Sequence, residues 1–137
     1  MAQIRVADPD AGPADERMAA YLEGKHHPQQ ALAPRTAFLC EANGSVIGYV
    51  AGHLTTRHGC DGEVQCLYVA PAHRRRGVAT RLLQRQVRWL VDQGARKVCV
   101  NADPDNAVAI AFYTRRGATP IGRAWLAWTE SACRLLT

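Results

Sequence analysis

The chain has 137 residues and a net charge of +5, with 47% hydrophobic and 21% charged residues. This size suits one folded domain over residues 1–137, and the hydrophobic fraction is too high for a disordered chain. No apolar run reaches the roughly 18 residues of a membrane helix, and the first residues lack the pattern of a secretory signal, so we expect a cytoplasmic protein without a membrane partner.

The first half of the chain predicts a strand, a helix and then consecutive strands. Alternating polarity predicts a strand over Ala2–Ala7, and an amphipathic pattern predicts a helix over Pro13–Lys25. The segment His26–Pro34 is compatible with a short helix or with a loop. Further strands are expected over Thr36–Glu41, Ser45–Thr55 and Glu63–Val69, with Asn43-Gly44 as a hairpin turn between the first two.

The second half alternates helices with strands. Apolar residues at helical spacing from Val78 onward predict a helix that ends at Gly94. An antiparallel meander that leads into a βαβ unit indicates an α/β fold, a mixed sheet with helices on both faces. The remaining elements are expected to be a strand over Lys97–Val100, a helix over Asn106–Arg116, and strands over Ile121–Thr129 and Cys133–Leu136.

Basic residues are concentrated in one segment. Eight Lys or Arg residues and a single acid, Asp92, occur between His73 and Lys97. Such a segment favours a polyanionic ligand, either nucleic acid or a phosphorylated small molecule. The five cysteines are odd in number and lack CxxC spacing, which is typical of reduced thiols. His53, His58 and Cys60 lack metal-site spacing, so no metal is expected.

An arginine- and glycine-rich loop joins the strand Glu63–Val69 to the next helix. Unpaired N–H groups at a helix start lie at the positive end of the macrodipole and favour a phosphate. Gly77 and Ala79 leave room for a ligand near the backbone, and the Thr80 hydroxyl adds a donor. The loop has neither P-loop nor GxGxxG spacing. From spacing alone, the alternative to a phosphate-binding loop is therefore a loop of solvated arginines before an ordinary helix.

Two motifs follow one another along the chain. The first is Arg74-x-x-Gly77-x-Ala79, after a strand ending in Leu67-Tyr68-Val69, and the second is Asn106-x-x-Ala109-x-x-Phe112-Tyr113-x-x-x-Gly117. Together, in this order, they resemble the GCN5-related N-acetyltransferases, and the resemblance extends from about Thr36 to Gly117. It implies the acyl-CoA N-acyltransferase fold, a mostly antiparallel mixed sheet of about six to seven strands with a V-shaped splay between two central parallel strands.

The resemblance implies acetyl-coenzyme A as cosubstrate. The pantetheine arm would pair like an added strand with the backbone of Leu67, Tyr68 and Val69. Asn106 would contact the pantetheine side or cap the helix that it begins. The pyrophosphate would lie on the loop formed by Arg74, Arg75, Arg76, Gly77, Val78, Ala79 and Thr80.

The resemblance also implies two catalytic roles. Tyr113 matches the tyrosine that serves as general acid beside the thioester sulfur, and its alternative role is a core aromatic. Glu63 matches the glutamate that serves as general base in histone-type members, and its alternative role is a solvated strand residue. Another branch of the family carries a glutamate where this chain has Asn101, which cannot accept a proton.

We therefore expect an acetyl-coenzyme A-dependent N-acetyltransferase in which a primary amine of a small molecule or peptide attacks directly in a ternary complex. A nucleic-acid-binding protein that uses the basic segment is one alternative, although no reading motif supports it. A non-catalytic acyl-coenzyme A sensor with the same fold is another. Trp125 and Trp128, on a predicted C-terminal strand, would suit a core or a homodimer contact more often than a substrate cage.

Overall fold

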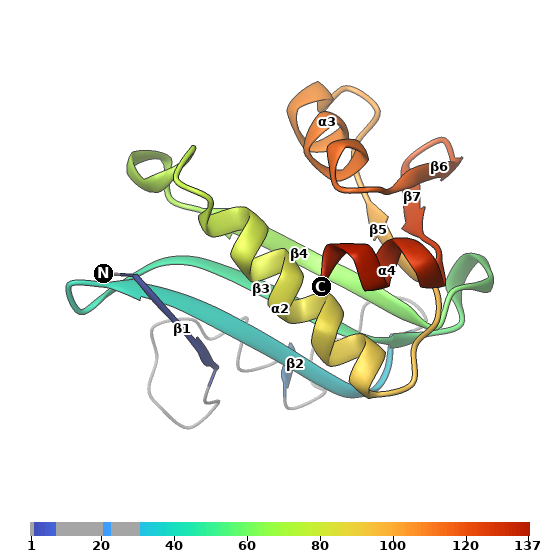
Figure 1. The fold of residues 1–137 in the computed structure, drawn as a ribbon, viewed down its shortest axis with the longest axis horizontal. Coiled ribbons are helices and arrows are strands. Elements are labelled where there is room, and N and C mark those ends of the chain that lie inside the picture. Colours follow the sequence, from blue (N-terminus) through green and yellow to red (C-terminus); the bar gives the residue numbers. More distant parts are fainter. Residues whose placement is uncertain (1, 8–20, 23–30) are drawn as a thin grey trace.

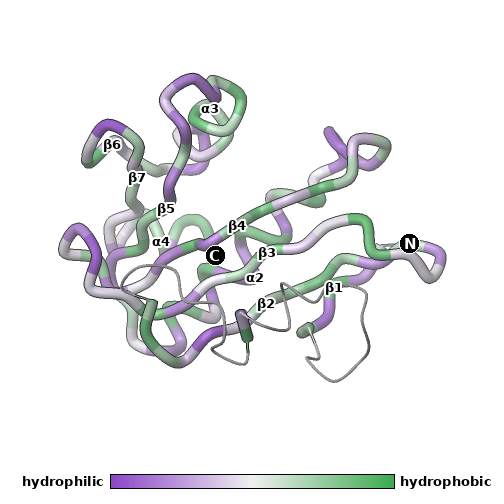
Figure 2. The backbone as a smooth tube through the Cα atoms, turned by 180° about the vertical axis from the view of Figure 1, so that it is seen from behind, coloured by the Kyte–Doolittle hydropathy of each residue, from purple (hydrophilic) through white to green (hydrophobic). Residues whose placement is uncertain are grey.

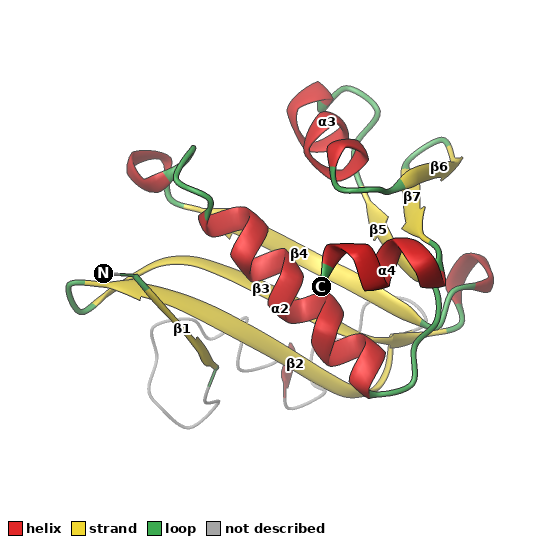
Figure 3. Ribbon diagram, in the orientation of Figure 1, coloured by secondary structure: helices red, strands yellow, loops and turns green. Residues whose placement is uncertain are grey.

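The computed structural model describes residues 2–7, 21–22 and 31–137, so most of the predicted helix Pro13–Lys25 lies outside the described residues. The described strands form one mixed sheet in the order β1-β2-β3-β4-β5-β7-β6 (Figures 1 and 3). The strands are β1 (Gln3–Val6), β2 (Ala31–Ala42), β3 (Ser45–Thr55), β4 (Gly62–Val69), β5 (Val98–Asn101), β6 (Thr119–Gly122) and β7 (Trp125–Trp128). The helices are α2 (Val78–Asp92), α3 (Ala107–Arg115) and α4 (Glu130–Leu136), with short 3-10 turns η2 (Arg57–Gly59) and η3 (Pro71–His73).

The hairpin between β2 and β3 is confirmed, and β2 is longer than expected. Asn43 and Gly44 have φ angles of 52° and 80°, the left-handed values that this type of turn requires. A helix or loop was expected over His26–Pro34. This is wrong for the last residues of the segment, because β2 already begins at Ala31. A register shift between Leu32 and Arg35 leaves Pro34, which has no N–H, outside the regular ladder.

The C-terminal segment is helical, so the expected strand Cys133–Leu136 is wrong. The Thr129 hydroxyl accepts a hydrogen bond from the Ala132 N–H at 3.3 Å and caps α4. Arg134 pairs with Glu130 one turn earlier at 2.8 Å. The cap and the contacts between side chains three and four residues apart therefore explain the helix. Its two buried residues, Cys133 and Leu136, both lie in the segment that was expected to be a strand.

The other C-terminal prediction, a strand over Ile121–Thr129, is replaced by two antiparallel strands, β6 and β7. Trp128 on β7 is fully buried, so its expected alternative as a dimer contact is wrong. Trp125 at the start of β7 is half-buried.

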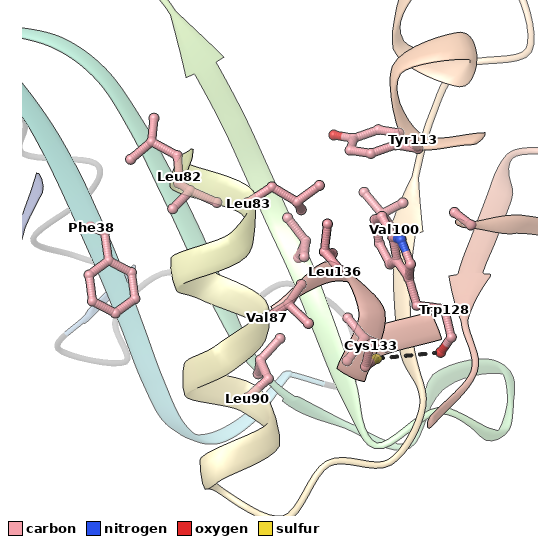
Figure 4. Close-up of a cluster of buried hydrophobic side chains, with 14 of the residues drawn as sticks. Phe38, Leu82, Leu83, Val87, Leu90, Val100, Tyr113, Trp128, Cys133 and Leu136 are labelled. Carbon is pink, nitrogen blue, oxygen red and sulfur yellow. Dashed lines mark hydrogen bonds between the residues drawn. The ribbon is translucent and has the colours of Figure 1, made fainter. Parts of the chain in front are cut away.

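The helix α2 covers β2, β3 and β4, and the main hydrophobic core lies between this helix and the sheet. Figure 4 shows Leu82, Leu83 and Val87 of α2 extending toward the sheet and toward α4. Each fully buried leucine stabilises the fold by about 1.5–3 kcal/mol. The helical residues Tyr21 and Leu22 belong to a separate cluster with Ala51 of β3. Figure 2 shows the sheet from behind, with hydrophobic segments along the strands and hydrophilic segments in the loop after β4.

The parallel strands β4 and β5 separate after a short paired stretch. Gly62 lies beside Val98 and Val64 beside Val100, and β4 then continues to Val69 without β5 alongside. Figure 1 shows the two strands diverging, with α3 beyond the end of β5. One edge of β4 is therefore left without a neighbouring strand among the described elements, as the expected V-shaped splay requires.

A β-bulge at Gln65 changes the alternation of side chains along β4. Cys66 lies opposite Ala51 and Val64 opposite Gly52, so Gln65 has no partner residue on β3. In a regular strand, residues five positions apart point to opposite faces. The bulge instead brings residues 63 and 68 to the same face of the sheet.

That shared face is the one opposite α2. Glu63 lies beside His53 there, and the ring of Tyr68 lies 5.4 Å from that of Tyr49 between centroids. Val64 and Val69 belong to the core beneath α2. The bulge therefore decides which side chains of β4 can reach a ligand on either side of the splay.

Candidate active site

A cavity of about 740 Å³ lies where β4 and β5 separate. It is bordered by the end of β4, the loop into α2, the first turn of α2, and α3. All of the predicted cofactor-binding residues line it except Arg76, which is exposed on the loop. The structure thus brings the two sequence motifs together across one cavity.

The strand edge and the loop are joined by a direct contact. The Arg74 Nε–H donates to the backbone carbonyl of Val69 at 2.9 Å. This hydrogen bond holds the loop against the end of β4, so Arg74 has an internal partner in addition to its place on the cavity wall. Leu67 and Tyr68, just before it, line the cavity beside the unpaired edge.

The start of α2 faces the same cavity. Gly77, the N-cap residue, has a φ of 80°, and Arg75 has a φ of 64°. A glycine adopts this left-handed conformation without the steric cost that a β-carbon brings. No side-chain hydrogen bond caps the helix at Gly77, so N–H groups of the first turn border the cavity and suit an anion.

Asn106 and Tyr113 both lie on the α3 side of the cavity. The Asn106 side-chain oxygen accepts a hydrogen bond from the Ala109 N–H at 3.1 Å, which establishes its capping role. Tyr113 is 7% exposed, and its ring meets that of Trp128 edge to face at 5.7 Å. Burial raises the pKa of the Tyr113 phenol to about 12. In Figure 4 its hydroxyl is directed toward the side of β4.

Glu63 lies outside the cavity lining, in a buried polar cluster. Its Oε1 is 3.2 Å from the Arg57 Nε and 3.6 Å from the His53 Nε2. On the other side of the imidazole, the His53 Nδ1 is 2.7 Å from the Tyr21 hydroxyl. The Glu63 side chain is only 5% exposed, so the alternative of a solvated strand residue is wrong.

Sequence reasoning missed several cavity residues. Their spacing was available as a signal, because residues three and four positions apart along α3 share a face with Asn106 and Tyr113. The two consecutive arginines before Gly117 were a further signal for a phosphorylated ligand. The missed residues are His73, Val108, Arg115 and Arg116, and the motif residues Ala109 and Phe112 also line the cavity although no ligand contact was assigned to them.

The histidines considered as metal ligands have other contacts. His53 is hydrogen-bonded to Tyr21, and the centroid of the His58 ring lies 4.6 Å from that of the Trp125 ring. Within the described ranges, no group of three or more His, Cys, Asp or Glu side chains could hold a metal ion. The described helices also include none with the length and hydropathy needed to cross a membrane.

A sequence profile of the Acetyltransferase (GNAT) family matches residues 3–118. The aminoglycoside N(6')-acetyltransferase type 1 of Salmonella typhimurium is 30% identical over 81 residues, covering 53% of this chain and 54% of that protein. The chain spans about half or less of the length of the curated relatives it matches.

Solved structures share the fold. The IAA acetyltransferase of Bacillus cereus gives a TM-score of 0.71 at 17% identity, covering 94% of this chain and 99% of that one. The PaiA N-acetyltransferase of Thermoplasma acidophilum, solved in complex with coenzyme A, gives 0.59 at 16% identity, with coverages of 69% and 60%. These matches confirm the expected acyl-CoA N-acyltransferase fold.

Proposed function

Because the chain belongs to the GNAT family of acetyltransferases, we propose that it transfers the acetyl group of acetyl-coenzyme A to a primary amine by direct attack in a ternary complex. The observation that carries this proposal is the cavity at the β4–β5 splay, which combines an unpaired strand edge with a basic loop and a helix start. The aminoglycoside-acetylating relative supports a small-molecule amine as acceptor.

The cavity fits a long ligand with an amide-containing arm and a phosphorylated end. The edge of β4 at Leu67–Val69, which has no neighbouring strand among the described elements, offers backbone groups to the amides of pantetheine. The first turn of α2 and the Arg75 side chain offer N–H groups and positive charge to the pyrophosphate. Val108 and Phe112 of α3 supply apolar surface between these polar regions.

Tyr113 serves the leaving sulfur as a hydrogen-bond donor. With its pKa at about 12, the phenol is protonated across the physiological range. Complete transfer of its proton to a thiolate, whose conjugate acid has a pKa of about 8.5, is uphill. A hydrogen bond that strengthens as charge develops on the sulfur avoids this cost.

Glu63 serves as the base for the ammonium form of the acceptor. An alkylamine has a pKa of about 10, so it must lose a proton before it can attack. Because Glu63 lies outside the cavity lining, it would receive this proton through an intervening water rather than by direct contact. The Arg57 and His53 side chains lie beside this carboxylate, at 3.2 Å and 3.6 Å from its Oε1.

Direct attack is also supported by the positions of the cysteines. Cys40, Cys60, Cys99 and Cys133 are buried, and Cys66 is half-buried on β4. The described cavity lining contains no cysteine. A thiol that carried the acetyl group between donor and acceptor would have to reach the thioester within that cavity.

Calorimetric titration with acetyl-coenzyme A tests the proposal, using Gly77→Asp beside the wild type. A carboxylate at the start of α2 repels the pyrophosphate, so we expect wild-type binding in the micromolar range and a loss of at least about tenfold in the variant. Gly44→Asp is the matched control, since both glycines have a φ of 80° and open space around an added β-carbon. The control should bind as the wild type does.

A folded wild-type sample that binds no acetyl-coenzyme A would overturn the proposal, and nucleic acid would then be the next ligand to titrate. Binding must also lead to turnover. A thiol-release assay with aminoglycosides, polyamines, amino acids and lysine peptides should show amine-dependent release of coenzyme A. Tight binding without release for every amine would instead identify a non-catalytic acyl-coenzyme A sensor.

A further inference from the structure

Arg116 joins the two walls of the cavity through one hydroxyl group. It follows α3 directly, and its Nε and Nη2 lie 2.9 Å and 2.7 Å from the Thr80 Oγ1 in the first turn of α2. Its Nη1 donates to the Phe112 carbonyl at 2.9 Å, and its guanidinium carbon lies 3.7 Å from the centroid of the Phe112 ring. Arg116, Thr80 and Phe112 all line the cavity.

This contact determines what the Thr80 hydroxyl can still do. A hydroxyl has two lone pairs and one proton, and the two Arg116 N–H groups occupy both lone pairs. Thr80 is therefore left as a hydrogen-bond donor only. Next to the N-terminus of α2, the complement of such a donor is an acceptor with negative charge, such as a phosphate oxygen.

Arg116 also carries a charge that is not balanced by a neighbour. No carboxylate in the described part of the chain forms an ion pair with it, and the adjacent Arg115 is also cationic. Burial, and then the charge of Arg115, lower the pKa of Arg116. A cation that is partly withdrawn from water without an acidic partner becomes more stable when an anion binds nearby.

We propose that Arg116 is a positioning residue that holds Thr80 as an obligate donor to the pyrophosphate of acetyl-coenzyme A and fixes the spacing between α2 and α3. This inference rests on the proposed function, because it assigns the phosphate position of that ligand. Arg116 acts through Thr80, whereas Arg75 on the loop would meet the phosphates itself.

The test compares Arg116→Gln and Thr80→Val in titrations with coenzyme A, dephospho-coenzyme A and S-acetylpantetheine, which carries no phosphate. Each variant should weaken the two pyrophosphate-containing ligands by the same factor, about tenfold, since hydrogen bonds to charged groups have this magnitude. Binding of S-acetylpantetheine, followed by tryptophan fluorescence up to millimolar ligand, should be unchanged. Thr80→Ser, which retains the hydroxyl, should bind as the wild type does.

The double variant tests whether the two residues act as a unit. If Arg116 works through Thr80, Arg116→Gln with Thr80→Val should bind coenzyme A no more weakly than the weaker single variant. Losses that multiply would overturn the inference. Should Arg116→Gln unfold, Thr80→Val keeps the guanidinium and carries the test alone.

The other outcomes are equally distinct. Equal weakening of S-acetylpantetheine would indicate a merely structural role, and weakening of coenzyme A alone would show that Arg116 reads the 3′-phosphate itself. Either result contradicts the inference. A wild type that binds coenzyme A while both variants bind equally well overturns this inference only, whereas a wild type that binds none of the ligands overturns the proposed function with it.

Discussion

The buried Glu63 carboxylate and the half-buried Arg57 guanidinium form an ion pair, with Oε1 3.2 Å from Nε. Arg57 also stacks over the Trp125 ring at 4.8 Å, which connects the η2 turn to β7. Removal of one partner from a poorly hydrated pair leaves a charge without compensation. The proposed base is therefore part of the packing at the centre of the sheet as well as of the chemistry.

Glu63→Gln should show whether Glu63 acts as the base, because the amide keeps the size of the side chain but cannot accept the proton. We expect kcat to fall about 100-fold at neutral pH, because general base catalysis contributes at least this much. Affinity for acetyl-coenzyme A should stay unchanged, since Glu63 does not line the cavity. Activity should recover as the pH approaches about 10, where the amine loses its proton unaided. A pH–rate profile measures this, and a constant deficit at all pH values would exclude Glu63 as the base.

Tyr113→Phe should lower kcat about tenfold and leave KM for acetyl-coenzyme A unchanged, because it removes a hydrogen bond that strengthens only as the sulfur departs. In the wild type, deprotonation of Tyr113 should not limit the rate below about pH 11, since burial raises the pKa of this phenol to about 12. Steady-state kinetics at several pH values decide this. A change in KM alone would show that Tyr113 only binds the cofactor.

The same phenol should affect stability at alkaline pH. Burial raises the pKa of this phenol from its ordinary value of about 10 to about 12, so between these pH values the folded state keeps the proton that the unfolded state releases. Ionisation of Tyr113 does not affect the free energy of unfolding below about pH 10. As the pH rises through about 12, it lowers this free energy by a total of about 2–3 kcal/mol. In urea unfolding, the wild type should therefore lose stability relative to Tyr113→Phe between these pH values. A constant difference would contradict the buried phenol.

Two substitutions of Asn106 distinguish its role as a helix cap from a direct contact with the ligand. Asn106→Ala should lower the free energy of unfolding by about 1 kcal/mol, because the Ala109 N–H loses its acceptor. Asn106→Ser restores a capping oxygen and should recover both stability and affinity for coenzyme A. Thermal unfolding and calorimetry on the same samples give the two quantities. Restored stability with weak binding would instead identify Asn106 as a direct ligand contact.

Gly52 lies opposite the β-bulge, where there is little space for a side chain. An added β-carbon would lie 2.6 Å from the Gln86 Nε2 and 2.8 Å from the Glu63 carbonyl oxygen. Gly52→Ala should therefore destabilise the chain by about 1–3 kcal/mol through overpacking. Gly122→Ala is the control, because nothing lies within 4 Å of its added β-carbon. Equal melting temperatures for the two variants would show that the sheet adjusts freely.

Local patterns in the sequence were enough for the hairpin, for the helices α2 and α3, and for the residues at the start of α2. The Asn43-Gly44 turn, the apolar spacing from Val78 and the cap at Asn106 each depend on neighbours within about four residues. The two motifs resembling the acetyltransferases are also local patterns, and the resemblance that they carry implied nearly all of the cofactor residues that line the cavity.

Only the tertiary structure decided the features that join distant segments. The bulge at Gln65 depends on the pairing of β4 with β3, and it places Glu63 in the cluster with Arg57 and His53. The contact between Arg116 and Thr80 joins residues 36 positions apart. Such contacts arise from the way in which helices and strands pack, and no local period or cap in the chain encodes that packing.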